Sequence, residues 1–246
     1  MVTVRCKDTL FSNVKAILFD KDGTLANSEA FLRNLAQRRS RLIDAQVPGV
    51  QEPLLMAFGV EGERINPAGL MAVGTRQDNE VAAAAYIAET GRGWVDSLTL
   101  SRSAFVEADK YLPDKAQQTP PVVGVLELLK TLTAHGLKIA VLSSDSTHQV
   151  QNFLQTYQLN AYVQIQLGVD GYTRKADPKL LHEVLSLLEV EPQQVLVVGD
   201  AQTDVEVAHN LTALGCIGFT GGWSGTVSLS EADVLIEQLS QIEILP

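Results

Sequence analysis

The segment VKAILFDKDGTL (residues 14–25) decides the fold that this sequence predicts. Its first six residues are apolar apart from Lys15, and the run ends at Asp20, which is followed by the turn signal Asp22-Gly23. A short apolar run of strand-favouring residues that stops at a glycine indicates a buried β-strand. Residues 14–19 are therefore expected to form a strand with two carboxylates just beyond its carboxyl end.

The same pattern returns in the second half of the chain. Residues 138–142 form an apolar run before Ser143-Ser144, and residues 194–198 form another before Gly199-Asp200. Such an alternation of strands with helical segments predicts an α/β fold, a Rossmann-like, doubly wound parallel sheet with helices on both faces. Weaker strand signals lie at residues 214–219 and 233–236, and helix-period segments lie at residues 122–134, 147–158, 178–188 and 204–211.

A long stretch between the first and second strands breaks this rhythm. Residues 27–116 contain no convincing strand but three helical segments, at residues 29–45, 78–90 and 94–111. We interpret them as an inserted all-helical cap domain, with residues 1–26 and 117–246 forming the catalytic core. Linkers near residues 26–27 and 116–120, with Pro113 and Pro120-Pro121 on the return side, would let the cap open and close.

Composition excludes several classes of protein. With 246 residues, 46% of them apolar, the chain can form a large core without disulfides, so Cys6 and Cys216 are expected to be reduced thiols of a cytoplasmic protein. The formal net charge of −10 argues against a general nucleic-acid binder. No apolar stretch approaches the length that spans a bilayer, which argues against a membrane protein.

Polar residues gather where the predicted strands end. Asp20 with Asp22, Ser143 with Ser144, and Asp200 with Asp204 each follow a strand, and Lys175 lies between the last two pairs. Ligands of open α/β sheets bind at the carboxyl ends of the strands. One such pair is weak support for a site, because Asp and Ser are common in turns. Four polar clusters in this order indicate a functional site.

These clusters resemble the four motifs of the haloacid dehalogenase-like superfamily. Residues 19–25 (FDKDGTL) look like its DxDGT motif, Ser143 its second motif, Lys175 in Lys-x-Asp-Pro its third, and residues 199–204 (GDAQTD) its GDxxxD motif. The insertion lies where members with a helical cap of the first type carry it. Lys21 and Ala176 depart from the usual residues, but neither departure removes a side chain that the chemistry needs. Phosphoglycolate phosphatase-like enzymes are the nearest resemblance.

The resemblance and the chemistry together assign roles to the acidic residues. A carboxylate that attacks a dianionic phosphomonoester needs a hard cation such as Mg²⁺ to offset the repulsion. Asp20 is the expected nucleophile, which forms an acyl-phosphate, and Asp22 the expected general acid and base. The resemblance implies that Asp22 also gives Mg²⁺ its backbone carbonyl. Asp200 is expected to supply the second carboxylate to the metal, with Asp204 as a further ligand or orienting group.

Three further residues complete the expected site. Ser143 and the backbone N–H of Ser144 are expected to bind the phosphate oxygens, and Lys175 to neutralise charge on Asp20 and the phosphoryl group. On the cap, Arg76 is a candidate for contacting the far end of the substrate.

Each of these residues also has a purely structural interpretation. Asp200 could cap the helix that follows, and Asp204 could simply favour the positive end of that helix. Ser144, Asp145 or Ser146 could cap the helix after the second strand, as could Ser143. Lys179 competes with Lys175, but its place at a helix start favours a solvated role. Trp223 is interpreted as a packing residue that could border the site, and a solvated helix face is expected for Arg33, Arg38, Arg39 and Arg41.

The retained acid Asp22 separates the possible reactions. An alkoxide leaving group needs a proton whereas a halide does not, so dehalogenation is disfavoured. The expected function is a Mg²⁺-dependent phosphatase acting on a small phosphorylated metabolite. The alternatives are a sugar phosphomutase of the β-phosphoglucomutase type and a catalytically silent phosphate-binding protein. The sequence identifies neither the organic part of the substrate nor the oligomeric state.

Overall fold

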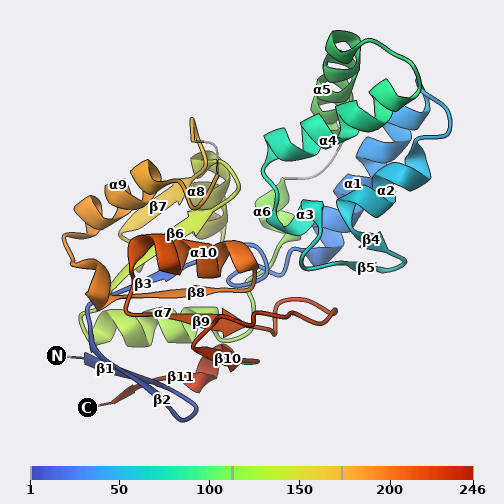
Figure 1. Cartoon of the computed structure of the whole chain (residues 1–246). Coiled ribbons are helices and arrows are strands. Elements are labelled where there is room, and N and C mark those ends of the chain that lie inside the picture. The colour runs from blue at the N-terminus through green and yellow to red at the C-terminus, as the bar shows by residue number, and fades with distance from the viewer. Residues whose placement is uncertain (1, 112–113, 173, 246) are drawn as a thin grey trace.

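A six-stranded parallel sheet with helices on both faces forms the centre of the molecule. The computed structural model describes residues 2–111, 114–172 and 174–245, so Pro113 of the expected return linker lies outside the described residues (Figure 1). The strand order is β10-β9-β8-β3-β6-β7, with β3 (Ala16–Phe19) between β8 (Val195–Gly199) and β6 (Lys138–Ser143). The first strand of this sheet in the sequence is thus central, and both its neighbours run parallel to it.

Alternate residues of β3 pack on opposite faces of the sheet. Ala16 and Leu18 belong to the hydrophobic cluster that includes α9 (Pro178–Leu188) and α10 (Gln202–Leu211). Ile17 and Phe19 belong to the cluster that includes α7 (Val125–Ala134) and α8 (Thr147–Thr156). All four residues of β3 are buried, as expected for a strand covered on both sides. The predicted doubly wound α/β fold is confirmed.

The described part of the chain also contains strands that had weak sequence signals or were not predicted. β9 (Gly215–Phe219) and β10 (Val234–Ile236) match weak sequence signals, whereas β7 (Ile165–Gly168) is short, only half-buried and was not predicted. A separate antiparallel sheet, also not predicted, joins the two ends of the chain in the order β11-β1-β2. Its strands are β1 (Val2–Cys6), β2 (Thr9–Val14) and β11 (Ile242–Leu245), and two short 3₁₀ helices lie at Pro192–Gln194 and Leu239–Gln241.

The insertion forms a group of helices to one side of the sheet (Figure 1). It is helical apart from a small hairpin of β4 (Val60–Glu61) and β5 (Arg64–Ile65), so the expectation of no strand there is corrected. The hairpin has two residues per strand, too few to give a periodic sequence signal. The helices are α1 (Glu29–Asp44), α2 (Gln51–Phe58), α3 (Leu70–Val73), α4 (Arg76–Glu89) and α5 (Trp94–Lys110).

The two segments that connect the insertion to the sheet lie side by side. The backbone N–H of Asn27 donates to the carbonyl of Pro120 at 2.8 Å, and that of Val122 donates to the carbonyl of Leu25 at 2.9 Å. The return segment is partly helical, because α6 (Lys115–Gln118) occupies most of the expected linker. Within the described residues, Cys6 and Cys216 are free and buried, and none of the helices has the length and apolar character needed to cross a bilayer.

Candidate active site

Three buried carboxylates meet at the carboxyl edge of the sheet. Asp20 directly follows β3, and its backbone N–H donates to the carbonyl of Val198 at 2.9 Å, which fixes it beside β8. Asp200 directly follows β8, and Asp204 lies in the first turn of α10. One carboxylate oxygen from each of the three lies within 4.8 Å of the others. Residues 184 positions apart in the chain thus converge because parallel strands end at the same edge.

Lys175 lies in the middle of this acidic cluster. Its Nζ donates to Oδ1 of Asp20 and, at 2.5 Å, to Oδ1 of Asp204. Burial alone would lower the pKa of Lys175, but Asp20 and Asp204 outweigh burial and raise it. Lys179, the alternative, is exposed at the start of α9. The structure therefore brings Lys175, not Lys179, to the carboxylates.

Asp204 has both a structural and a site contact. Its Oδ2 accepts from the backbone N–H of Ala201 at 3.0 Å, which completes the start of α10, while Oδ1 accepts from Lys175. The N-cap position of α10 is Ala201, so Asp200 does not fill it. Gly199 allows this geometry, because a Cβ there would collide with the carboxyl group of Asp204. The helix-end interpretation of Asp204 is thus correct and compatible with a place in the cluster.

Asp200 is held by two donors from different parts of the chain. Thr24 Oγ1 donates to one carboxylate oxygen and Trp223 Nε1 to the other, both at 2.6 Å. Trp223 is therefore more than the packing residue expected, because its indole N–H orients an acid of the site. Gly23 has φ +87°, and a Cβ there would collide with both Trp223 and Asp200. The glycine of the first motif is needed for its conformation and for this close approach.

The cluster carries too little positive charge to balance its acids. Burial, Asp204 and Asp22 raise the pKa of Asp20 to about 6, although Lys175 acts in the opposite direction. Burial, followed by Asp20 and Asp204, also raises the pKa of Asp200 well above its usual value. One ammonium group facing three buried carboxylates is a donor set that fits a hard divalent cation such as Mg²⁺.

The side chain of Asp22 belongs to a second, separate cluster of charges. Its Oδ2 accepts from Lys21 Nζ at 2.6 Å and from Lys115 Nζ at 2.8 Å, and its Oδ1 accepts from Ser28 Oγ. The same two lysines contact Oδ2 of Asp145, at 2.9 and 2.6 Å. Burial tends to raise the pKa of Asp22, but Lys115 and Lys21 together hold it below its usual range.

Sequence reasoning missed most of this second cluster. Lys21 was noted only as a departure from the usual apolar residue, yet its side chain is 1% exposed and bridges two acids. Lys115 lies 93 positions from Asp22 on the return linker, where no spacing rule points to the site. A basic residue inside the first motif was the available signal, because a buried lysine needs a carboxylate partner.

Ser143, the last residue of β6, and Ser144, which follows it, lie beside the acidic cluster. Ser143 is buried, and its Oγ accepts from the backbone N–H of Asp145 at 3.1 Å. Ser144 Oγ donates to the carbonyl of Val73 in the insertion at 3.4 Å. The N-cap of α8 is Ser146, whose Oγ accepts from the backbone N–H of Gln149 at 3.3 Å. Ser143 does not cap this helix, and it borders the same small cavity as the acids.

A small cavity at the sheet edge is bordered by residues from both parts of the molecule. Its volume is about 20 Å³, room for roughly one water molecule. Ala72 and Val73 of the insertion close one side of it, opposite the sheet edge. The expected site residues that border it are Asp20, Asp22, Ser143, Ser144, Lys175, Asp200 and Asp204.

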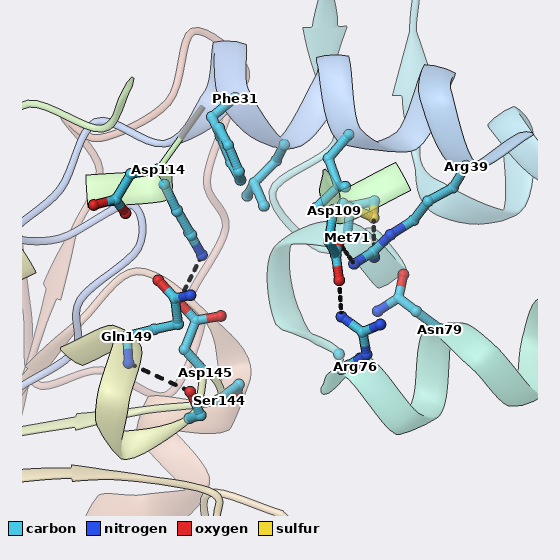
Figure 2. Close-up of a pocket in the computed structure, with 15 residues that line it drawn as sticks. Phe31, Arg39, Met71, Arg76, Asn79, Asp109, Asp114, Ser144, Asp145 and Gln149 are labelled. Atoms are coloured by element: carbon cyan, nitrogen blue, oxygen red, sulfur yellow. Dashed lines mark hydrogen bonds and ion pairs between the residues drawn. The ribbon is translucent and has the colours of Figure 1, made fainter. Parts of the chain in front are cut away.

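A larger cavity of about 370 Å³ lies between the insertion and the sheet, and Arg76 and Arg39 both line it (Figure 2). Arg76 follows the N-cap Thr75 and is held by Glu80 at 2.8 Å and by Asp109 at 2.5 Å. Arg39 is 5% exposed and lies 4.1 Å from the ring centre of Phe105. Burial lowers the pKa of Arg39 to about 10, which leaves it charged at neutral pH.

The expected solvated face of α1 is therefore corrected at one position. Arg39 points into the molecule because its helix turns that position towards α5, while Arg41 remains exposed. Arg33 pairs with Glu63, and Arg38 lies over the ring of Tyr111. Four arginines within nine residues gave no sequence signal to separate the buried one from the others.

Comparison with known proteins gives consistent matches over most of the chain. Residues 14–212 match the haloacid dehalogenase-like hydrolase family. A phosphoglycolate phosphatase of Vibrio vulnificus is 28% identical over 243 residues, covering 93% of this chain and 94% of the relative. A validoxylamine A 7'-phosphate phosphatase of Streptomyces hygroscopicus is 27% identical over 229 residues, covering 93% and 95%.

Solved structures share the fold at lower sequence identity. A predicted phosphoglycolate phosphatase from Haemophilus somnus superposes with a TM-score of 0.66 at 22% identity, covering 93% of this chain and 96% of that one. A putative β-phosphoglucomutase from Thermotoga maritima superposes with a TM-score of 0.60 at 17% identity, covering 92% and 96%. At these identities the likeness concerns the fold alone.

Proposed function

Because the chain belongs to the haloacid dehalogenase-like hydrolase family, we propose that it is a Mg²⁺-dependent phosphatase that acts through a phospho-aspartyl intermediate on Asp20. Its substrate in this proposal is a small organic phosphomonoester, as for the phosphoglycolate phosphatases that it resembles. The observation that carries the proposal is the cluster of three buried carboxylates at the sheet edge, in which the ammonium group of Lys175 contacts Asp20 and Asp204 while Asp200 accepts from Thr24 and Trp223. Such a cluster places an attacking carboxylate where a cation is needed.

The proposed metal ligands are carboxylate oxygens of Asp20 and Asp200, the backbone carbonyl of Asp22, and Asp204 directly or through water. When bound there, Mg²⁺ would offset the repulsion between a carboxylate and a phosphate dianion. Thr24 and Trp223 support this assignment, because they orient Asp200 from behind with one hydrogen bond to each oxygen.

The chain's own residues supply the remaining steps of the proposed reaction. A carboxylate oxygen of Asp20 attacks phosphorus to form an acyl-phosphate while the ester P–O bond breaks and the alcohol leaves after its oxygen is protonated. Water then attacks the acyl-phosphate, which releases inorganic phosphate and regenerates the Asp20 carboxylate. Ser143 Oγ and the backbone N–H of Ser144 bind phosphate oxygens, and Lys175 keeps Asp20 ionised and in place. The buried position of Ser143 and the direct contact of Lys175 with Asp20 support these roles.

Asp22 is proposed to move protons at the leaving oxygen and at the attacking water. In the described arrangement Lys21 and Lys115 hold it as a carboxylate, the form that accepts a proton from water. To donate a proton to the leaving oxygen, Asp22 must first leave at least one of these lysines. Lys115 stands on the linker to the insertion, so a movement of the insertion would change this contact.

Residues 27–116 are proposed to act as a cap over a core of residues 1–26 and 117–246. Ala72 and Val73 border the small cavity together with the acids, which supports a covering role. A cap that closes over the site excludes water and gives the substrate its selectivity. Exchange of the cap for that of another family member should then change substrate preference while leaving Asp20 essential.

A phosphate-release assay tests the proposal. The purified protein is incubated with a panel of small phosphomonoesters, with Mg²⁺ and with EDTA, and Asp20→Asn serves as the blank. Metal-dependent release of inorganic phosphate is expected. Interconversion of sugar phosphates without release would instead indicate a mutase, and binding without turnover a silent phosphate-binding protein.

A further inference from the structure

The larger cavity lies where the organic part of a substrate would extend. Ser144 borders both this cavity and the small cavity at the sheet edge, so the two are neighbours. Its volume of about 370 Å³ falls within the range of pockets that enclose small organic ligands. A two-carbon leaving group such as glycolate would fill only a small part of that space.

Two polar atoms in the cavity wall are buried without a partner. Arg39 Nε, a donor, and Asn79 Oδ1, an acceptor, have no hydrogen-bond partner among the residues that the structure describes. The two side chains are 5% and 3% exposed. Leaving buried polar groups unpaired is unfavourable, so their presence together in one cavity wall points to a ligand that pairs them.

The orientation of the Asn79 amide is fixed by its other end. Asn79 Nδ2 donates to the carbonyls of Thr75 at 2.9 Å and Leu70 at 3.3 Å, so the nitrogen must face them and Oδ1 must face away. Figure 2 shows the Asn79 oxygen turned towards the guanidinium group of Arg39. The cavity wall thus holds a buried donor and a buried acceptor, and hydroxyl groups can satisfy both because a hydroxyl accepts and donates.

The opposite wall carries a further unpaired acceptor. Gln149 Oε1 on α8 is buried and also has no partner among the described residues. Gln149 lines the same cavity from the sheet side, facing the insertion (Figure 2). A ligand that pairs both walls therefore needs hydrogen-bonding groups at more than one position.

The charges of the cavity do not favour an anionic leaving group. Three cations line it, and each already contacts a carboxylate: Arg39 and Arg76 contact Asp109, and Lys115 contacts Asp145. With Asp114, the described lining residues carry three positive and three negative formal charges. A carboxylate accepts hydrogen bonds but cannot donate one, so it would leave Asn79 Oδ1 unpaired.

We propose that this cavity selects an uncharged, polyhydroxylated leaving group, a sugar or a cyclitol, whose hydroxyl groups pair with Arg39 Nε and Asn79 Oδ1. This inference rests on the proposed phosphatase function and narrows its substrate class. It separates this chain from a phosphatase specific for phosphoglycolate, although the reaction at Asp20 would be the same. Sites built to hydrogen-bond a hydroxyl discriminate strongly against analogues that lack it.

The first test compares substrates on the unmodified protein with Mg²⁺. The series contains D-glucose 6-phosphate, D-sorbitol 6-phosphate and myo-inositol 1-phosphate against ethyl phosphate and 2-phosphoglycolate, with kcat/KM as the measurement. At least one polyol phosphate should exceed both ethyl phosphate and phosphoglycolate by about 10-fold or more. Equal or better hydrolysis of phosphoglycolate would overturn the inference but leave the phosphatase proposal standing. Metal-dependent release from none of the esters would overturn both.

The second test uses matched arginine variants of α1. Arg39→Met removes the Nε donor, whereas Arg41→Met changes an exposed arginine on the same helix. The measurement is the ratio of kcat/KM for the preferred polyol phosphate to that for ethyl phosphate, with melting curves as a check on folding. The ratio should fall about 10-fold in Arg39→Met and stay constant in Arg41→Met. An unchanged ratio in folded Arg39→Met would overturn the assignment of Arg39. If that variant does not fold, the comparison of substrates on the unmodified protein tests the inference.

Discussion

The polar groups at the sheet edge and those in the larger cavity between the insertion and the sheet differ in how they are paired. At the edge, each acid has partners: Asp20 and Asp204 share Lys175, and Asp200 accepts from Thr24 and Trp223. In the larger cavity, Arg39 Nε and Asn79 Oδ1 are buried with no partner among the described residues.

The difference indicates what each region lacks. The edge has its hydrogen bonds but too few positive charges, a deficit that a cation removes. The cavity has balanced charges but missing hydrogen bonds, a deficit that a hydroxylated ligand removes. The two proposals therefore assign the reaction to the sheet edge and substrate choice to the larger cavity, and substitutions in each region test this separation.

Replacing Asp20 should have the largest effect. Asp20→Asn keeps the size of the side chain but removes the attacking carboxylate, so kcat/KM should fall by at least about 10⁴-fold. The measurement is phosphate release from the best ester of the panel. Asp8→Asn, in the exposed turn between β1 and β2, is the matched control and should keep full activity. Comparable rates in Asp20→Asn and the control would refute the role of Asp20.

Removing the metal should abolish the reaction through its effect on the acids at the sheet edge. EDTA should abolish phosphate release, and saturating Mg²⁺ should restore it and raise the melting temperature, because a ligand at about 100 times its Kd stabilises the folded state by about 2.7 kcal/mol. Asp200→Asn should weaken the Mg²⁺-dependent shift of the melting temperature. A shift of unchanged size in this variant would show that the cation binds elsewhere.

The buried lysine of the first motif should matter for stability. Lys21→Met leaves Asp22 and Asp145 with one shared lysine fewer, and breaking a buried charge network of this kind costs about 3 kcal/mol. Urea unfolding followed by circular dichroism measures the change. Lys15→Met, at an exposed lysine beside the same strand, should change the free energy of unfolding by less than about 0.5 kcal/mol. Equal effects in the two variants would contradict the bridging role of Lys21.

Arg76 should have the smallest effect. Its guanidinium is already paired with Glu80 and Asp109, and 45% of its side chain is exposed. Arg76→Met should therefore lower stability by about 1 kcal/mol at most, and the kinetics with the preferred ester should change less than in Arg39→Met. A larger loss of kcat/KM in Arg76→Met than in Arg39→Met would restore Arg76 as the substrate contact and reverse the comparison within the cap.

The sheet and the acids at its edge could be predicted because local sequence determines them. Apolar runs ending in Asp20, Ser143 and Asp200 predict both the strands and the edge where their side chains meet. The antiparallel sheet that joins the chain ends and the hairpin of β4 and β5 were not predicted. Short strands carry little periodicity, and pairing between distant chain ends leaves no local signal.

The partners of the site residues could not be predicted for a different reason. Lys115 reaches Asp22 only because the return linker is helical and crosses beside the first motif. Whether Arg39 or Arg41 is buried depends on the rotation of α1 against α5, which composition does not determine. Such contacts are properties of the packed structure rather than of any one segment.

The closed side of the small cavity has a consequence for the rate of turnover. Ala72 and Val73 leave about 20 Å³ beside the acids, too little for a phosphoryl group, and Ser144 is hydrogen-bonded to Val73. In the proposed reaction, substrate entry and phosphate exit would both require the α3 segment to move through solvent. Turnover would then be slower in a viscous medium even when bond cleavage itself is unaffected, so added sucrose or glycerol would lower kcat in proportion to the drag on the moving segment.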